Sequence, residues 1–588
     1  MTDTKQSRLT ATLLCVTPPD EHQEQGIRAF LQKKYGEDVA LTIQQDASLK
    51  SGFQLHVGSE VYDWSAKGRM EQFRQQVEQL VAKNTRKDII PLLRSSIDEF
   101  RLLAKSSEVG TVKSIGDGIA VVEGLEHAAY GEILMFDNGI KGMVQDLRRN
   151  ETGCILFDNA DDISAGSKVA RTGKTAGVPV GDAFLGRVVD ALGRPIDGGA
   201  AIPADGYRPV EEPAPGIIDR QSVDTPMETG LLSIDAMFPI GRGQRELIIG
   251  DRQTGKTAIA LDAMLNQKGK NVICVYVAIG QKASSVAQLV ENLRKRDAMD
   301  YCVVVSATAG EADTMQYIAP YAGCAMAEYY MHKGRDVLIV YDDLSKHAIA
   351  YRAMSLLLER APGREAYPGD VFYLHSRLLE RSAHLSDKLG GGSMTALPIV
   401  ETQAGDVSAY IPTNIISITD GQIFLESDLF FAGQRPAVNV GLSVSRVGGA
   451  AQTKATKKAT GSLRLDLAQY REMEVFTQFS SDLDDSTKEQ LHYGQGLMRI
   501  LRQKQYHPLS MHQQVIVLVC AMGHVLSKVA VKDVTDFRDA LLDHFEQEHS
   551  DLCRSLEDEK VLTDDMKQEI LRIAEAFRTA NAERFRKE

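Results

Sequence analysis

The sequence predicts a multidomain fold in which a small α/β module, a β-barrel, an α/β domain with a glycine-rich loop and a helical domain follow one another. Three observations predict this order. A glycine-rich loop stands between an apolar run and a helix-forming run near the middle of the chain. Before it, glycines separate short alternating segments, which is typical of a small barrel. After about residue 456, apolar residues recur at helical spacing to the end.

The N-terminal module is predicted over residues 1–83. Alternation of apolar and polar residues indicates half-buried strands, and spacings of three and four indicate amphipathic helices. Gly36 is a natural end for the first helix. The expected strands lie at 10–16, 39–43, 53–57 and 61–62, and the expected helices at 20–35 and 70–81.

Four further segments follow. A charged amphipathic helix is expected as a connector over residues 84–105, and glycine-spaced short strands predict a β-barrel over 106–172. Apolar strands then alternate with helices over 173–455, as in an α/β domain. Residues 456–588 are predicted to be helical, with the last helix capped at Thr563.

Composition excludes several classes of protein. The formal net charge of −13 argues against a general nucleic-acid binder. No apolar run reaches membrane-spanning length and no signal peptide opens the chain, so we expect a soluble protein that meets a membrane only through a complex. The seven cysteines form no C-x-x-C pair and read as reduced core thiols, with no zinc site expected. His347, His375 and His384 read as packing or capping residues.

The glycine-rich loop has the form G-x-x-x-x-G-K-T, between the strand-like run 246–249 and the helix-forming run 258–265. This is the context of a phosphate-binding loop, or P-loop. Its backbone N–H groups are expected to surround phosphate oxygens at a helix N-terminus. Lys256 is expected at the β- and γ-phosphates, and the Thr257 hydroxyl at Mg²⁺. The loop consists of Gly250, Asp251, Arg252, Gln253, Thr254, Gly255, Lys256 and Thr257, and Ala258 follows it.

Two strand ends after the loop carry further chemistry. The apolar run 337–341 ends in Asp342, which we expect in the Mg²⁺ shell opposite Thr257. The strand over 271–279 leads into Gln281, where P-loop ATPases of this type place a catalytic glutamate. An amide hydrogen-bonds a water molecule but cannot act as a base. The alternative is that catalysis uses Glu311 or Asp313.

Arg446 lies in a loop of small residues at the end of the α/β domain. An arginine in such a loop is suited to stabilise the γ-phosphate of a neighbouring subunit as an arginine finger. Composition alone would instead favour a surface arginine without a special role.

Five stretches resemble the alpha subunit of F-type ATP synthases, and the resemblance extends from about residue 106 to the end of the sequence. The stretches are PIGRGQRELIIGDRQTGKT at 239–257, YVAIGQK at 276–282, YDDLSK at 341–346, PGREAYPGDVF at 362–372 and NVGLSVSRVG at 439–448.

The resemblance implies a β-barrel, a RecA-like nucleotide-binding domain and a helical C-terminal domain. Three alpha and three catalytic beta subunits would alternate in a ring around a rotating gamma shaft, at the cytoplasmic face of the cell (inner) membrane. The alpha site would bind ATP or ADP with Mg²⁺ without turning it over. Arg446 matches the arginine finger and Ser443 a position needed for activity. Arg435, Gln503 and Gln505 match residues near the adenine.

The first eighty residues instead resemble the C-terminal part of the delta (stator) subunit. The matching stretches are SLKSGF at 48–53, VGSEVYDWS at 57–65 and RMEQF at 69–73. The helical bundle that forms the N-terminal part of delta is missing. The resemblance implies that residues 10–80 contact the b-type peripheral stalk, and we expect the apolar face of Met70, Phe73 and Val77 to do so.

Two other functions remain open. One is a self-sufficient hexameric P-loop motor. A glutamate at position 281 would favour this function, and the glutamine that stands there, Gln281, disfavours it. The other is a structural stator component with a vestigial P-loop, against which the intact Lys256, Thr257 and Asp342 argue. The sequence does not distinguish H⁺ from Na⁺ coupling, or ATP synthesis from hydrolysis.

Overall fold

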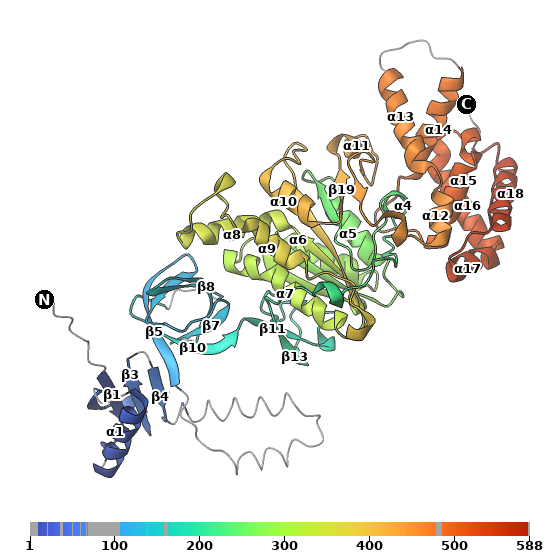
Figure 1. Cartoon of the computed structure of the whole chain (residues 1–588). Coiled ribbons are helices and arrows are strands. Elements are labelled where there is room, and N and C mark those ends of the chain that lie inside the picture. Colours follow the sequence, from blue (N-terminus) through green and yellow to red (C-terminus); the bar gives the residue numbers. More distant parts are fainter. Residues whose placement is uncertain are drawn as a thin grey trace. The chain divides into compact units, whose positions relative to one another are not determined.

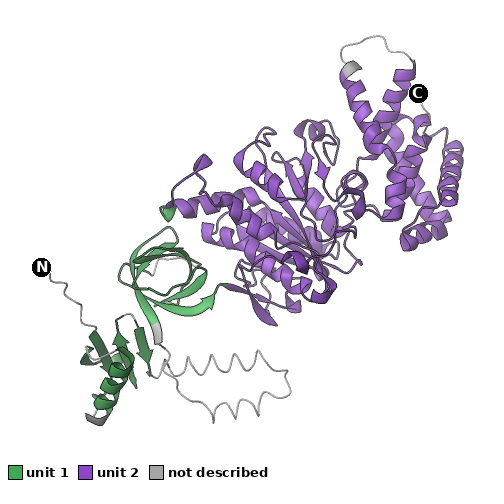
Figure 2. Cartoon of the chain, viewed as in Figure 1, with its two compact units in different colours: residues 1–176, 357–359 green, residues 177–356, 360–588 purple. Residues whose placement is uncertain are grey.

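The structure, a computed structural model, describes residues 10–19, 21–35, 39–49, 51–58, 60–65, 68, 106–137, 139–157, 163–477 and 485–585. The polypeptide divides into two compact units, residues 1–176 with 357–359 and residues 177–356 with 360–588 (Figure 2). The expected helix over 70–81, with Met70, Phe73 and Val77, lies outside the described residues, and so does the expected connector over 84–105.

The N-terminal module is a sheet with one described helix, α1 (Glu21–Tyr35). β1 (Thr10–Cys15) pairs in parallel with β2 (Ala40–Gln45) and antiparallel with β3 (Phe53–Val57), which pairs with β4 (Glu60–Asp63). Alternate residues of β1 are buried, and Leu13, Leu31 and Leu55 belong to one core cluster. The four predicted strands and the first predicted helix are confirmed, because alternation and helical spacing gave the correct burial patterns.

Six strands form the barrel. Their order is β10-β7-β8-β9-β6-β5, and β10 also pairs with β5, which closes the sheet. At Gly142 a Cβ atom would lie 2.5 Å from the Cys154 sulfur, so only glycine fits between these neighbouring strands. The strands are β5 (Ser106–Gly116), β6 (Ile119–Glu123), β7 (Glu132–Phe136), β8 (Lys141–Leu147), β9 (Glu151–Leu156) and β10 (Lys168–Thr175).

The α/β domain is built on an eight-stranded sheet in the order β12-β16-β15-β17-β18-β14-β19-β20, parallel except for the last pair. Nearly every residue of β15 and β17 is buried, so both faces of these strands are covered. Helix α7 (Asp313–Met331) packs on β15, β16 and β17 (Figure 1). The strands are β12 (Val188–Val189), β14 (Leu247–Gly250), β15 (Val272–Gln281), β16 (Cys302–Thr308), β17 (Asp336–Asp342), β18 (Ser393–Glu401), β19 (Gly421–Leu425) and β20 (Val444–Ser445).

Other described elements of this domain complete its layers. A short antiparallel pair, β11 with β13, precedes the sheet in sequence. These elements are β11 (Gly177–Val180), β13 (Gly206–Pro209), α4 (Leu232–Met237), α5 (Lys256–Leu265), α6 (Ala283–Arg294), α8 (Leu344–Leu357), α9 (Val371–Leu379), α10 (Tyr410–Ile418) and α11 (Ser427–Phe431).

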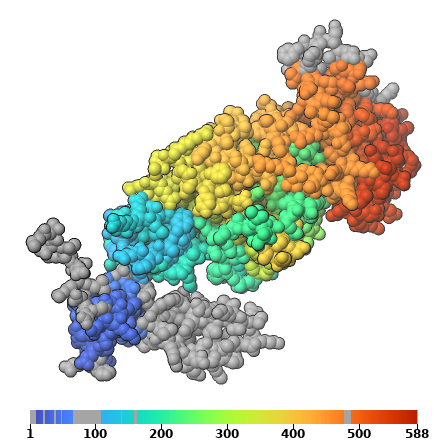
Figure 3. Space-filling view, viewed as in Figure 1, coloured from blue at the N-terminus to red at the C-terminus, as the bar shows by residue number. Residues whose placement is uncertain are grey.

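The described elements after β20 are helical, as predicted. Thr563 accepts a hydrogen bond from the backbone N–H of Met566 and caps α18 as expected. The helices share one continuous core with the α/β domain, and the two abut in the space-filling view (Figure 3). They are α12 (Lys454–Thr460), α13 (Leu463–Thr477), α14 (Asp485–Ile500), α15 (Met511–Met522), α16 (Val534–Glu548), α17 (Ser550–Glu559) and α18 (Asp564–Ala580).

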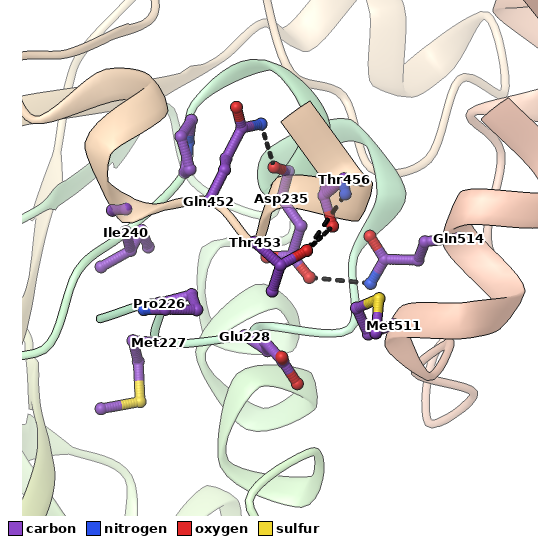
Figure 4. Close-up of a pocket in the computed structure, with 12 residues that line it drawn as sticks. Pro226, Met227, Glu228, Asp235, Ile240, Gln452, Thr453, Thr456, Met511 and Gln514 are labelled. Atoms are coloured by element: carbon purple, nitrogen blue, oxygen red, sulfur yellow. Dashed lines mark hydrogen bonds between the residues drawn. The ribbon is translucent and has the colours of Figure 1, made fainter. Parts of the chain in front are cut away.

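A buried carboxylate joins the α/β domain to the helical domain (Figure 4). Asp235 of α4 accepts hydrogen bonds from the backbone N–H groups of Thr229 and Gly230, the Thr229 hydroxyl and the Gln514 amide of α15. Burial raises the pKa of Asp235, and these donors oppose that shift. The adjoining cavity of about 20 Å³ has room for one water molecule, so this feature is a structural joint and not a ligand site.

Candidate nucleotide-binding site

The P-loop connects β14 to α5, so the predicted strand, loop and helix are in place. Gly255 has a φ of 96°, in the left-handed region that disfavours other residues. The buried Lys256 donates through Nζ to the Gly250 carbonyl at 2.9 Å. Burial lowers the pKa of Lys256, and the carboxylates of Glu401, Asp343, Asp342 and Asp251 oppose that shift.

Asp342 is brought beside Thr257, as the sequence predicts. The Thr257 hydroxyl donates to Oδ2 of Asp342 at 2.8 Å, and the Tyr276 hydroxyl donates to the same oxygen at 2.5 Å. Burial raises the pKa of Asp342, while both hydroxyl donors lower it. A hydroxyl and a carboxylate beside a P-loop lysine are the protein groups that hold Mg²⁺ in P-loop proteins.

Gln281 faces the same acid. Its Nε2 donates to Oδ1 of Asp342 at 3.0 Å, from the end of the neighbouring strand β15. Glu311 accepts from the backbone N–H and hydroxyl of Thr308, and neither Glu311 nor Asp313 lines the adjoining cavity. Gln281 therefore lines the cavity where the phosphates are expected, whereas Glu311 and Asp313 do not line it.

A cavity of about 700 Å³ adjoins the P-loop, within the size range of small-molecule sites. It extends from the loop to residues of the helical domain. Its lining includes most of the predicted nucleotide contacts: Gln253, Thr254, Gly255, Lys256, Thr257, Ala258, Gln281, Asp342, Arg435, Gln503 and Gln505.

Three predicted contacts do not line the cavity: Gly250, Asp251 and Arg252. The Asp251 carboxylate instead accepts from the Thr402 and Ser427 hydroxyls and the Gly405 N–H, so it braces the loop from outside. Arg252 is exposed and pairs with Glu401 at 3.1 Å.

The far end of the cavity has an aromatic and basic lining. The Arg435 guanidinium lies 4.2 Å from the centroid of the Phe430 ring, a cation–π contact. The Gln503 amide is committed to the backbone, because it donates to the Gly230 carbonyl and accepts from the Leu232 N–H. Gln503 therefore shapes this end of the cavity, and protein groups already engage its amide nitrogen and its amide oxygen.

Sequence reasoning missed several residues of the lining. Glu401 ends β18 much as Asp342 ends β17, and this repeated pattern of an apolar run ending in an acid could have identified it. Asp262 is a buried acid on α5 that accepts from the Tyr506 N–H at 2.8 Å. No local signal marks Phe430, Gly433, Arg502 or Thr535, which also line the cavity.

Arg446 and Ser443 lie apart from this cavity and are not among its lining residues. Arg446 is exposed, whereas Ser443 is fully buried and its Oγ accepts from the Phe424 N–H. The backbone N–H of Arg446 donates a hydrogen bond to the Asp420 carbonyl. The Arg245 guanidinium donates two hydrogen bonds to the Asp420 carboxylate. The loop is thus fixed while the Arg446 side chain is presented to solvent.

Three features define a P-loop nucleotide-binding protein: a P-loop on a mainly parallel sheet, an acid at the end of another strand of that sheet, and an adjoining cavity. Comparison with known proteins narrows this class: the protein belongs to the family of F-type ATP synthase alpha subunits, and its first residues match the delta subunit. It is 58% identical over 483 residues to the ATP synthase subunit alpha of Clostridium botulinum strain Kyoto, a match that spans 82% of the present sequence and 96% of that subunit. It is 56% identical over 491 residues to the same subunit of Clostridium kluyveri, spanning 84% and 97%.

Four family models match successive parts of the sequence. They are the ATP synthase delta (OSCP) subunit at 1–77, the β-barrel domain of the ATP synthase alpha/beta family at 105–173, the nucleotide-binding domain of that family at 230–445, and its C-terminal domain at 452–577. The predicted family and fold class, including the delta-like beginning, are confirmed. Among the described residues, no helix combines the length and apolar character needed to span a membrane.

Proposed function

We propose that this protein is the nucleotide-binding, non-catalytic alpha subunit of a rotary F-type ATP synthase, coupling ATP synthesis or hydrolysis to the transport of protons or sodium ions. The observation that carries the non-catalytic role is the hydrogen bond from Gln281 to Asp342. An amide at the catalytic glutamate's expected place orients water but takes no proton from it.

The residues of the cavity fit ATP or ADP with Mg²⁺. Backbone N–H groups of the loop and Lys256 would hold the phosphates, and Thr257 with Asp342 would hold the ion. Gly255 supports this role, because its left-handed backbone brings the loop close to where phosphate oxygens would lie. Arg435 and Gln505 would contact the base. When bound, Mg²⁺ neutralises phosphate charge.

We predict that the purified full-length protein binds Mg-ATP at equilibrium and turns it over far more slowly than about 1 s⁻¹, the low end for enzymes. Lys256→Ala should abolish binding, since the phosphates lose their cation, while circular dichroism shows an intact fold. Steady turnover by the wild type would contradict the proposal. Loss of that turnover in Glu401→Gln would then identify Glu401, a further carboxylate of the lining, as the base.

Arg446 is proposed to act in a neighbouring catalytic beta subunit as an arginine finger. Its exposure and its fixed backbone support this role, since a finger must reach out of its own subunit in a defined direction. Ser443 supports the loop from beneath through Phe424. The guanidinium would stabilise charge on the transferred phosphoryl group.

The proposed complex is a ring of three alpha and three beta subunits around a gamma shaft, peripheral at the cytoplasmic face of the cell membrane. Residues 10–80 are proposed to bind a b-type peripheral stalk, as their match to the delta (OSCP) model suggests. The acidic balance of the sequence supports protein partners over nucleic acid.

A further inference from the structure

Three helices of the C-terminal domain bring together metal-ligating side chains that are far apart in sequence. His512 comes from α15, Glu546 from α16 and Cys553 from α17. One donor atom from each lies within 4.8 Å of the others. None of these residues lines the nucleotide cavity.

His512 is held in an orientation suited to a metal ligand. Its Nδ1 lies 2.8 Å from Oε2 of Glu557, which also accepts the His512 backbone N–H at 3.1 Å. Its Nε2 lies 2.7 Å from Oε1 of Glu546. A carboxylate that accepts a hydrogen bond from Nδ1–H keeps the proton on Nδ1, and in that tautomer the Nε2 lone pair can bind a metal.

The donor set selects the kind of ion. An imidazole nitrogen, a sulfur and a carboxylate oxygen suit Zn²⁺, whereas Mg²⁺ and Ca²⁺ require mainly oxygen ligands. Cys553 is buried and the Glu546 side chain is 42% exposed, so water has access to one side of the group. The Gln513 amide also donates to Glu546 and steadies its carboxylate.

We propose that His512, Glu546 and Cys553 bind one Zn²⁺ ion, with water as the fourth ligand and Glu557 orienting the imidazole. Binding releases the thiol proton, and any proton shared between His512 and Glu546, to solvent. The ion would link α15 to α16 and α17, close to the turn that joins these two helices. The sequence predicts no zinc site here because no two of the ligands share a short spacing motif.

A second group of side chains near the same corner provides a matched control. His544, Glu548 and His549 also lie within 4.8 Å of one another through their donor atoms. However, the His544 ring packs on Phe577 and the His549 ring on Phe545, and no thiol belongs to the group. Both imidazole rings of this second group therefore have a packing role against aromatic residues.

The test uses the purified full-length protein, freed of metal with a chelator and titrated with Zn²⁺ against a chromophoric competitor. We expect one equivalent to bind, and Co²⁺ in its place to give a thiolate-to-metal charge-transfer absorption. Cys553→Ser should remove that absorption, and Cys553→Ser and Glu546→Gln should each abolish stoichiometric zinc binding. Glu557→Gln should weaken binding about 10–100-fold, the scale for partners that orient a ligand.

His549→Gln should bind zinc like the wild type. Mg-ATP binding and circular dichroism report whether each variant is folded. The proposal is overturned if the wild type binds no stoichiometric zinc, or if folded Cys553→Ser and Glu546→Gln bind it as tightly as the wild type. Loss of binding in His549→Gln alone would assign the ion to the other group and would equally overturn it.

Discussion

At the scale of single residues, Arg446 combines an exposed side chain with a backbone N–H that is hydrogen-bonded to the Asp420 carbonyl. Arg446→Lys keeps the charge but loses the planar fork that binds a phosphoryl group through two N–H donors. We predict that the ATPase rate of the assembled complex falls about 10³-fold or more, the scale for arginine fingers. Steady-state kinetics of the reconstituted complex measures this effect.

Two controls accompany this variant. Mg-ATP binding to the subunit's own cavity should change little, because Arg446 does not line it. Arg572→Lys, at an exposed position of α18, makes the same chemical change and should leave the ATPase rate unaffected. An unaltered rate in the Arg446→Lys complex would rule out the finger.

Asp262 supplies a prediction about pH. Burial raises its pKa from 3.8 to about 6, while the Tyr506 N–H and the Arg296 charge oppose that shift. Between these values the folded protein keeps a proton that the unfolded protein releases, so the contribution of Asp262 to stability falls as pH rises through this window. Asp262→Asn removes the titration.

The apparent melting temperature of Asp262→Asn, relative to wild type, should therefore rise between about pH 4 and about pH 7. The neutral amide keeps an oxygen that can accept from the Tyr506 N–H, so the comparison isolates the charge. A pH-independent difference between the two proteins would show that Asp262 titrates normally in the folded state.

The residues of the site differ in how far the sequence could predict them. Lys256 and Thr257 belong to one contiguous motif, and Asp342 ends a recognisable apolar run, so local pattern was sufficient. Arg502 and Thr535 enter the cavity from the helical domain, through a tertiary packing that no local pattern encodes. Gln503 was predicted near the adenine by resemblance, but its hydrogen bonds to Gly230 and Leu232 became known only from the structure.

At the scale of elements, the joint between α4 and α15 depends on one amide. Gln514 donates to the buried Asp235 carboxylate at 2.8 Å. Gln514→Leu has a similar volume but leaves that carboxylate oxygen short of a donor. The Gly230 N–H still donates to that oxygen, so we predict the loss of one hydrogen bond to a charged group, about 1.5–3 kcal/mol in the free energy of unfolding. Denaturant unfolding followed by circular dichroism measures it.

The matched control is Gln568→Leu, the same substitution at an exposed position of α18, which should stay within about 0.5 kcal/mol of wild type. Equal effects of the two variants would mean that the Asp235 joint carries no special stability.

Elements were predictable where their patterns are local. Alternation predicted β1 to β4, and glycine spacing predicted the barrel. The order of strands in the large sheet was not predictable, because β14 lies between β18 and β19 and so pairs with strands much later in sequence. Such non-local pairing depends on the whole set of crossovers and not on any one segment.

At the scale of the whole molecule, the delta-like module is part of the same polypeptide as the nucleotide-binding domain. Fusion would hold a stalk contact at high effective concentration beside the ring. Three copies in each ring would present three such modules where a single stalk is expected, so some would remain idle. We therefore expect the complex to contain no ordinary separate delta subunit, which the composition of the purified complex tests directly.

Removal of residues 1–80 is the decisive test of this arrangement. The deletion removes β4, which pairs with the start of β5. It leaves intact the segments of β5, β6 and β10 whose pairing closes the barrel, and the nucleotide site lies in the other compact unit. We predict that the truncated subunit assembles a ring with normal soluble ATPase activity, while ATP-driven ion transport in reconstituted vesicles is lost because the stalk is no longer held. Normal transport by the truncated complex, or a stoichiometric full-length delta in the intact one, would show that the module is not the stator contact.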